Sequence, residues 1–183
     1  DYTISTAFDA ASHLFESYFS LKSTNLSHMY SIEGIHSYAK AVNALQKKQF
    51  DEQSRNDLMY ASMLGGIAIS HTGTTAMHAM GYSMTYFHKM PHGFSNIYFV
   101  KPYFQHMMKH EKDKTMLVIK EFGFSDIDSM CDFFLCDMER PVLNQEQCVK
   151  YGAIAMIQSS IKATPGNLET EDIVRMYKEA GSL

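Results

Sequence analysis

The stretch that organises this chain is residues 77–93, which read MHAMGYSMTYFHKMPHG. It holds three of the nine histidines, His78, His88 and His92, and it ends in the tripeptide Pro-His-Gly. Apolar residues surround His78 on most sides, which is typical of a buried helix. Pro91 should end that helix, because the residue before a proline avoids the α region. We therefore expect a helical frame that holds a histidine-rich centre.

Helical spacing continues on both sides of this stretch. Near the N-terminus, Phe8, Ala11, Phe15 and Tyr18 recur at steps of three and four, the period of an amphipathic helix. Prolines occur only four times, and no alternating strand pattern of any length is present. The sequence predicts a single all-α domain over residues 1–183. The expected helices cover 5–20, 27–48, 51–70, 72–88, 91–110, 125–138, 144–161 and a last segment from 170. Asp51 is a candidate cap of the third helix, and Asn144 with Gln147 resembles a capping box.

Composition excludes several classes of protein. The chain has 183 residues, of which 45% are hydrophobic, and a net charge of −4, which argues against a nucleic-acid partner. No apolar run reaches the ~18 residues that a membrane span needs. Cys131, Cys136 and Cys148 have spacings that fit neither a disulfide framework nor a zinc ribbon. Reduced thiols of this kind predict a cytoplasmic protein.

A second polar stretch near the N-terminus complements the first. Asp9 and His13 lie four residues apart on the first expected helix, so both side chains share one face, about 5–6 Å apart at Cβ. Together with His78 and His92 they would supply one carboxylate and three imidazoles. Such a set suits a divalent ion such as Fe²⁺ or Zn²⁺ and leaves a position open for substrate.

Spacing alone leaves other interpretations open. An aspartate and a histidine four apart on a helix are commonly a surface pair, and His78 could be a hydrogen-bonded core residue. Two further histidine pairs have the same spacing. His88 and His92 are separated by a proline that interrupts the helical register, and His106 and His110 lie among charged residues, so we expect them to be solvated.

Four stretches resemble the C-terminal helical domain of the iron-containing (group III, metal-dependent) alcohol dehydrogenases. Residues 9–16 are similar to the family's Asp-Ala-x-x-His-x-x-Glu, and residues 55–70 to its Arg-x-x-Met-x-x-Ala-x-x-x-Gly. Residues 78–96 are similar to its two histidines with 13 residues between them, followed by the pattern Pro-His-Gly-x-x-Asn around the second histidine. Residues 165–173 resemble the family's ending. The resemblance covers essentially the whole chain, in order.

The resemblance implies that Asp9, His13, His78 and His92 are the metal ligands. Many members of the family carry another histidine four residues after the third ligand, close to the nicotinamide. This chain has Tyr82 at that position, which puts the proton path in doubt. Tyr82 could line the pocket and join a proton relay, or it could be a packing residue. His88 is a second candidate for the substrate pocket.

The resemblance also implies a function and a fold. It indicates the metal-binding half of an NAD(P)-dependent alcohol dehydrogenase of the dehydroquinate synthase-like fold, in which the metal ion polarises an alcohol or aldehyde oxygen for hydride transfer. The chain has no Gly-x-Gly-x-x-Gly motif and no βα alternation, so no residue is assigned to dinucleotide binding. We expect that an N-terminal nucleotide-binding domain is missing from this chain, that the isolated piece is inactive, and that the whole protein is a homodimer.

Two other classes of protein compete with this interpretation. A helical metal-dependent hydrolase would use a metal-bound hydroxide and need no nicotinamide. A purely structural helical domain would bind no metal in stoichiometric amount. The family resemblance favours the dehydrogenase over both.

Overall fold

A computed structural model describes residues 2–135 and 138–181, and within these ranges the chain is helical without a strand. The all-α prediction is confirmed. No helix in the described part is both long and apolar enough to cross a membrane. The helices are α1 (Tyr2–Phe19), α2 (Asn25–Lys40), α3 (Val42–Lys47), α4 (Glu52–Thr72), α5 (Ala76–His88), α6 (His92–Ile97), α7 (Val100–His110), α8 (Lys112–Glu121), α9 (Ile127–Leu135), α10 (Gln145–Met156), the 3-10 turn η1 (Ile161–Ala163) and α11 (Thr170–Gly181).

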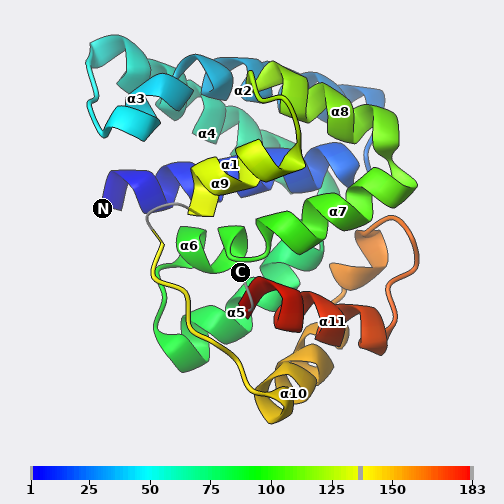
Figure 1. The fold of residues 1–183 in the computed structure, drawn as a ribbon. Helices are drawn as coiled ribbons and strands as arrows, with labels where there is room; N and C mark the ends of the chain where they lie inside the picture. Colours follow the sequence, from blue (N-terminus) through cyan, green and yellow to red (C-terminus); the bar gives the residue numbers. More distant parts are fainter. Residues whose placement is uncertain (1, 136–137, 182–183) are drawn as a thin grey trace.

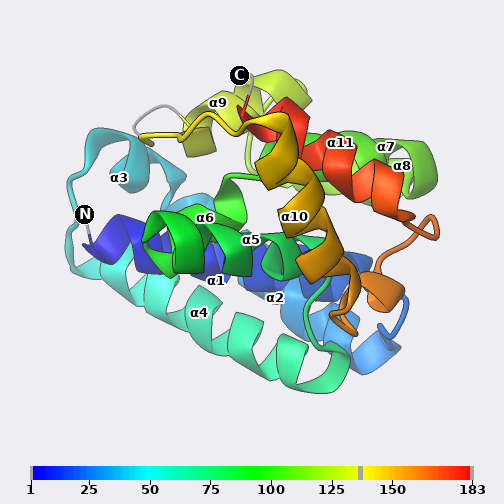
Figure 2. The same cartoon turned by 90° about the horizontal axis from the view of Figure 1, so that it is seen from below.

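Helix α1 runs through the middle of the molecule. In Figures 1 and 2 it lies between α2 and α4 on one side and α5 and α6 on the other. Its residues Ala11, Leu14 and Phe15 are completely buried, and each large apolar side chain so buried contributes about 1.5–3 kcal/mol. Phe15 also meets Phe104 of α7 edge-on, with ring centroids 5.1 Å apart. The helix that carries Asp9 and His13 is therefore fixed on all sides.

The C-terminal helices fasten α5 from the opposite side. Helix α11 packs on α10, and α10 packs on α5. The Tyr177 hydroxyl of α11 donates to the carbonyl oxygen of Met80 in α5 over 2.8 Å. Its ring meets Phe99 edge-on at 4.9 Å. These contacts hold the helix that carries His78 against the rest of the core.

Two helix starts follow the predicted capping chemistry. The Asp51 carboxylate accepts from the backbone N–H of Ser54 over 2.8 Å at the start of α4. Asn144 and Gln147 form the reciprocal capping box of α10, with both bonds at 2.9 Å. Each such cap contributes roughly 1 kcal/mol to helix stability.

Several boundaries differ from the sequence prediction. The segment expected over 91–110 divides into α6 and α7 at Tyr98 and Phe99, where the break allows both rings to be buried. The helix expected over 27–48 divides into α2 and α3 at Ala41. Helix α8 was not predicted, because its few buried residues stand among lysines and acids. Helix α10 ends at residue 156 rather than 161.

The cysteines agree with the expectation of unpaired thiols where the structure describes them. Cys131 and Cys148 are free and buried. Cys136 lies outside the described residues. Burial raises the pKa of the Cys131 thiol to about 12, which keeps it protonated and unreactive at neutral pH.

Candidate metal centre

Three histidine side chains surround the carboxylate of Asp9. Its Oδ1 atom lies 3.7 Å from Nε2 of His13, one turn further along α1. The same oxygen lies 3.6 Å from Nε2 of His78 and 3.6 Å from Nε2 of His92. The four predicted ligands therefore come together around one carboxylate, although they are drawn from three separate helices.

A glycine allows α6 to approach α1 closely enough to bring His92 to this place. A Cβ atom added to Gly93 would lie 1.8 Å from the carbonyl oxygen of Ser5 and 2.9 Å from the backbone nitrogen of Asp9. Any side chain at this position would push the two helices apart. The Pro-His-Gly sequence thus has a packing role: Pro91 precedes the first residue of α6, His92, and Gly93 seats the helix on α1.

The four side chains are not equivalent in geometry. The donor atoms of Asp9, His78 and His92 all lie within 4.8 Å of one another, the one such group of histidine, cysteine or acidic residues in the described part of the chain. His13 stands beside this group, with its ring stacked on that of His78 at a centroid distance of 5.0 Å and an interplanar angle of 19°. His13 thus contacts Asp9 but lies outside the group of three whose donor atoms are mutually close.

Glu16 explains why His78 presents Nε2 to the centre. This carboxylate is completely buried and contacts Nδ1 of His78. It also accepts hydrogen bonds from the backbone N–H of Thr75 at 2.8 Å, from the Thr75 hydroxyl at 3.0 Å and from the backbone N–H of His78 at 3.1 Å. With Nδ1–H donated to a carboxylate, Nε2 is the nitrogen that faces Asp9 and could bind a cation. In the sequence, Glu16 is marked only as the last residue of the Asp-Ala-x-x-His-x-x-Glu pattern.

The carboxylates of Asp9 and Glu16 influence the pKa values of the groups in this centre. Burial penalises the ionised form of Asp9, but the close contact with His78 and the neighbouring imidazoles outweigh it and lower the pKa of Asp9. Burial lowers the pKa of His13 and of His92. Burial also acts to lower the pKa of His78, yet the charge of Glu16 and the contacts with both acids raise it to about 9, so without a cation Nε2 of His78 carries a proton that a bound cation would replace. Two ionised carboxylates in one partly buried place favour a positive partner.

Asn96 adds a feature to which sequence reasoning assigned no role. Its side-chain Nδ2 lies 3.0 Å from Asp9 Oδ1, 3.0 Å from His78 Nε2 and 3.3 Å from His92 Nε2. Three possible ligand atoms thus surround one N–H₂ group. An electron-rich centre of this composition fits a divalent cation bound by nitrogen and oxygen. The only sequence signal was its place in the Pro-His-Gly-x-x-Asn pattern.

The two candidate pocket residues have different surroundings. Tyr82 is 45% exposed and borders the centre, with its ring stacked on His92 at 6.0 Å and edge-on to His78 at 6.3 Å. His88 lies ten residues after His78, about 15 Å further along α5. Its Nε2 atom is 3.1 Å from the hydroxyl of Tyr151 in α10. The structure brings Tyr82 to the centre and leaves His88 away from it.

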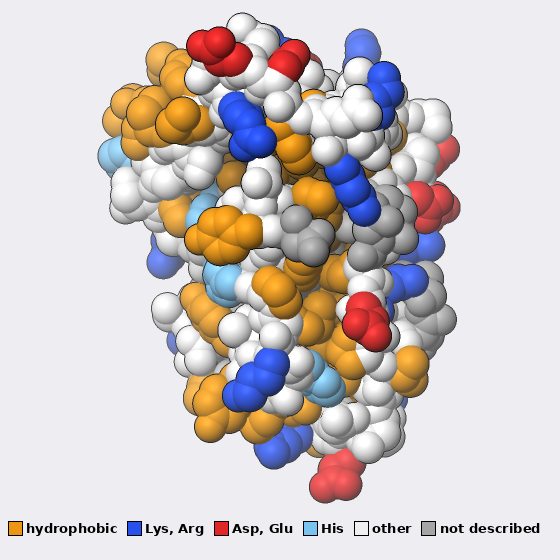
Figure 3. Space-filling view, turned by 90° about the vertical axis from the view of Figure 1, so that its left-hand side faces the viewer, with side chains coloured by type: hydrophobic (Ala, Val, Ile, Leu, Met, Phe, Trp, Pro, Cys, Tyr) orange, Lys and Arg blue, Asp and Glu red, His pale blue; other side chains and the backbone are white. Residues whose placement is uncertain are grey.

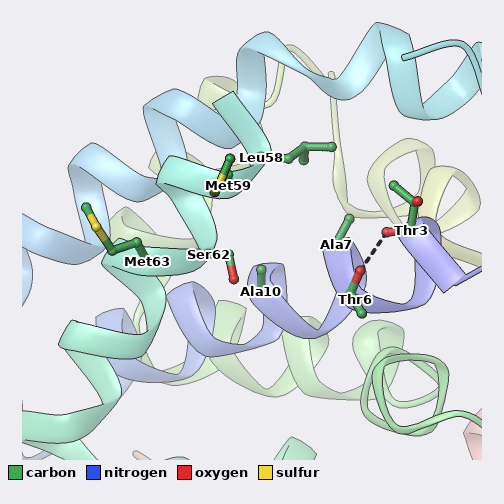
Figure 4. Close-up of a pocket in the computed structure, with 8 residues that line it drawn as sticks. All are labelled: Thr3, Thr6, Ala7, Ala10, Leu58, Met59, Ser62 and Met63. Carbon is green, nitrogen blue, oxygen red and sulfur yellow. Dashed lines mark hydrogen bonds between the residues drawn. The ribbon is translucent and has the colours of Figure 1, made fainter. Parts of the chain in front are cut away.

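A cavity of about 440 Å³ opens beside the centre. Its lining is mostly apolar and includes two of the predicted ligands; the lining residues are Tyr2, Ser5, Thr6, Asp9, Pro91, His92, Gly93 and Phe94. Figure 3 looks from the side on which α1 begins, and histidine side chains show there among hydrophobic ones. A cavity of about 430 Å³ between α1 and α4 (Figure 4) is lined by threonine, serine, alanine, leucine and methionine, without a histidine or an acid. Of these two cavities, only the first borders predicted metal ligands.

The expectation for the pair at 106 and 110 is wrong for one member. His106 is buried, with 6% of its surface exposed, and its Nε2 hydrogen-bonds to the carbonyl oxygen of Pro165 at 2.7 Å. His110 is exposed. The charged neighbours in sequence pointed to solvent, but the turn after η1 covers His106.

Comparison with known proteins identifies the family. Residues 3–134 match the model of the Fe-containing alcohol dehydrogenase family, C-terminal. Alcohol dehydrogenase 4 of Saccharomyces cerevisiae is 28% identical over 128 residues, which cover 69% of this chain and 34% of that protein. The 1,3-propanediol dehydrogenase of Klebsiella pneumoniae is 28% identical over 94 residues, 51% of this chain and 24% of that protein.

Solved structures agree with the sequence match. The iron-containing alcohol dehydrogenase of Thermotoga maritima superposes with a TM-score of 0.86 at 28% identity, over 99% of this chain and 49% of that one. Sulfoacetaldehyde reductase from Bifidobacterium kashiwanohense, solved in complex with NAD⁺, shares the fold with a TM-score of 0.84 at 20% identity. The chain spans about half the length of these structures and about a third of the yeast relative. This chain belongs to the Fe-containing alcohol dehydrogenase family and corresponds to its C-terminal helical domain.

Proposed function

We propose that this chain is the metal-binding half of an NAD(P)-dependent alcohol dehydrogenase that acts on a small alcohol or aldehyde. The observation that carries the proposal is the convergence of Asp9, His78 and His92, whose donor atoms lie within 4.8 Å of one another, in a chain of this family. Family relatives are named as alcohol and 1,3-propanediol dehydrogenases, which supports the reaction class.

Asp9, His13, His78 and His92 would hold the cation, either Fe²⁺ or Zn²⁺, since one carboxylate and three imidazoles suit both ions. His13 stands beside the other three, with its Nε2 3.7 Å from Asp9 Oδ1. When bound, the cation would act as a Lewis acid that polarises the alcohol or carbonyl oxygen. The apolar cavity next to Asp9 and His92 offers room for the carbon skeleton of a small substrate.

The remaining residues of the centre have supporting roles. Glu16 keeps a proton on Nδ1 of His78 and so preserves the lone pair of Nε2. Tyr82 stands at the open edge of the centre, and its hydroxyl is our candidate for proton exchange with solvent. Burial, together with Glu16 and Asp9, raises the pKa of Tyr82, so this hydroxyl stays protonated at neutral pH. His88 lies too far along α5 to touch a group held by His78, and we assign it no step.

The nicotinamide is proposed to come with a second domain. The described residues form no strand, whereas the usual dinucleotide site is built at the ends of parallel strands. We propose that an N-terminal domain of the same protein supplies this site. The chain alone should then fold and bind metal with reduced affinity, without NAD(P)-dependent turnover. Alcohol-dependent reduction of NAD⁺ or NADP⁺ by the isolated chain would contradict this. The homodimer stays a prediction.

Metal content tests the centre directly. The chain is purified after anaerobic addition of Fe²⁺ or Zn²⁺ and compared with an Asp9→Ala/His92→Ala double variant by elemental analysis. We expect about one equivalent of metal in the unchanged chain and a large loss in the variant. The matched control is His106→Ala/His110→Ala, which removes two histidines away from the centre and should retain metal. Equal metal in all three proteins would contradict the four-ligand site.

The same preparation separates the dehydrogenase from the alternative hydrolase. Metal-dependent hydrolysis of an activated ester, without nicotinamide and lost in the Asp9→Ala/His92→Ala variant, would favour the hydrolase. We expect no such turnover, because the relatives of this chain are named as dehydrogenases.

A further inference from the structure

Among the residues that the structure describes, Asn96 is the side chain that contacts donor atoms from all three ligand-bearing helices. Its Nδ2 is in hydrogen-bonding range of Asp9 from α1, His78 from α5 and His92 from α6, at 3.0, 3.0 and 3.3 Å. Asn96 is itself completely buried. A group placed at the meeting point of three helices controls how their side chains face one another.

The chain makes room for this amide at a specific glycine. A Cβ atom added to Gly81 would lie 2.2 Å from Oδ1 of Asn96 and 3.2 Å from its Cγ. Gly81 stands on α5, almost one turn after His78. Helices α5 and α6 can therefore enclose the carboxamide between them only because position 81 has no side chain.

The orientation of the amide is set by its donor end. Nδ2 donates to Asp9 Oδ1 and lies within 3.3 Å of two ring nitrogens, whereas Oδ1 is buried and has no hydrogen-bond partner among the described residues. Buried carbonyl groups without a partner are uncommon in proteins. An amide that leaves its oxygen unsatisfied is held in place by the contacts of its nitrogen, not by a balanced packing of both ends.

The three contacts differ in whether a cation could share them. A carboxylate oxygen has more than one lone pair, so Asp9 Oδ1 can accept from Asn96 and still coordinate a metal. An imidazole Nε2 has a single lone pair, so His78 and His92 must release the amide in order to bind a metal. The bond from Asn96 to Asp9 is the one that can persist in a loaded site.

We propose that Asn96 is a positioning residue of the metal centre, which orients the Asp9 carboxylate through its Nδ2–H···Oδ1 hydrogen bond and depends on Gly81 for its place. The inference rests on the proposed metal site and goes beyond it, because Asn96 is not one of the four ligands. Residues that orient a metal ligand through a hydrogen bond typically change metal affinity 10–100-fold when removed.

The test is metal affinity measured by chelator competition with Zn²⁺ and, for its visible spectrum, Co²⁺. Asn96→Leu removes the donor, and Gly81→Ala displaces the amide without changing Asn96. We expect both to weaken binding, Asn96→Leu by about 10–100-fold, and to alter the Co²⁺ spectrum. If Asn96→Leu does not fold, Asn96→Ser removes the amide without added bulk.

Thr85→Val is the matched control. It removes the hydrogen bond from the Thr85 hydroxyl to Ser95, 2.9 Å long, at the same contact between α5 and α6. It should lower thermal stability and leave affinity and spectrum unchanged. Unchanged affinity in Asn96→Leu, or an equal loss in Thr85→Val, would overturn the inference while the metal site stands. A chain that binds neither metal before substitution would overturn the proposed function and this inference together.

Discussion

Two clusters of histidine rings are present in this molecule, and they differ in what the Nε2 atoms face. At the metal centre the rings of His78 and His92 are 5.2 Å apart, and their Nε2 atoms face the Asp9 carboxylate. In the second cluster the rings of His106 and His110 are 4.5 Å apart. There, Nε2 of His106 is turned to the carbonyl oxygen of Pro165.

The difference lies in which ring nitrogen carries the proton. Glu16 accepts a hydrogen bond from Nδ1–H of His78, so Nε2 is the nitrogen that faces the centre and could bind a cation. His106 points an N–H at a backbone carbonyl, so the same atom is used to hold a turn. A histidine pair becomes a candidate metal site when a buried acceptor stands behind the ring and a second acid lies in front of it. Ring spacing alone does not separate the two cases.

Removal of the buried acceptor should break the metal centre most severely. Glu16→Ala would leave the N–H groups of Thr75 and His78 without partners in a dry interior. Loss of one member of a buried charged pair costs about 3–5 kcal/mol. Urea unfolding should show a loss of this order, whereas Glu33→Ala, at an exposed position, should change stability by less than about 0.5 kcal/mol. A loss below about 1 kcal/mol for Glu16→Ala would mean that the carboxylate does not organise the centre.

The next largest loss of stability is expected where α6 packs against α1. Gly93→Ala forces a Cβ atom into the carbonyl oxygen of Ser5, and overpacking of this kind costs about 1–3 kcal/mol or more. Because His92 moves with α6, metal content should fall as well. Gly66→Ala is the matched control, since no atom lies within 4 Å of the added Cβ and α4 should gain about 1 kcal/mol. Equal stability in the two variants would show that α6 can shift without cost.

A smaller loss is expected in the second cluster. His106→Ala leaves the Pro165 carbonyl without its partner, which costs about 1–3 kcal/mol. Metal content should not change, in contrast to His78→Ala, which removes a proposed ligand. Thermal unfolding of both variants measures the loss of stability, and elemental analysis measures the bound metal. An equal loss of metal from the two variants would contradict the assignment of metal binding to the first cluster alone.

The smallest effect is a dependence of stability on pH in the same cluster. Burial lowers the pKa of His106, while the Pro165 carbonyl and Asp172 oppose the shift and His110 and Lys109 reinforce it. A lowered pKa in the folded state means that neutral His106 contributes stability above its ordinary pKa, and that this stability is lost as pH falls through the lowered value. Between about pH 7 and about pH 5, the melting temperature should fall more in the unchanged chain than in His106→Gln. Parallel pH profiles would contradict the assignment.

Much of the fold could be predicted because its signals are local. The apolar period of α1 and the caps at Asp51 and Asn144 need only neighbours in sequence, and all three are confirmed. Helix α8 escaped prediction because its apolar positions are few and only tertiary contacts bury them. The division between α6 and α7 also depends on the core, since two large rings have to enter it side by side.

The candidate centre was only partly visible in the sequence. Asp9 and His13 share a helix face, so their pairing is a local property, and family resemblance indicated His78 and His92. The place of Glu16 behind His78 and of Asn96 among the ligands depends on how three helices pack, which no spacing along the chain encodes. The burial of His106 was missed for the same reason, because a turn 59 residues further along covers it.

The order in which the centre is assembled has a consequence during protein synthesis. Asn96 and Asp9 are 87 residues apart in the chain, and His78 and Glu16 are 62 apart. Helix α1 leaves the ribosome before the helices that bury Leu14 and Phe15 against it. Until they emerge, an apolar helix with a carboxylate in its middle stands in water, and a nascent chain in that state is a natural client for chaperones.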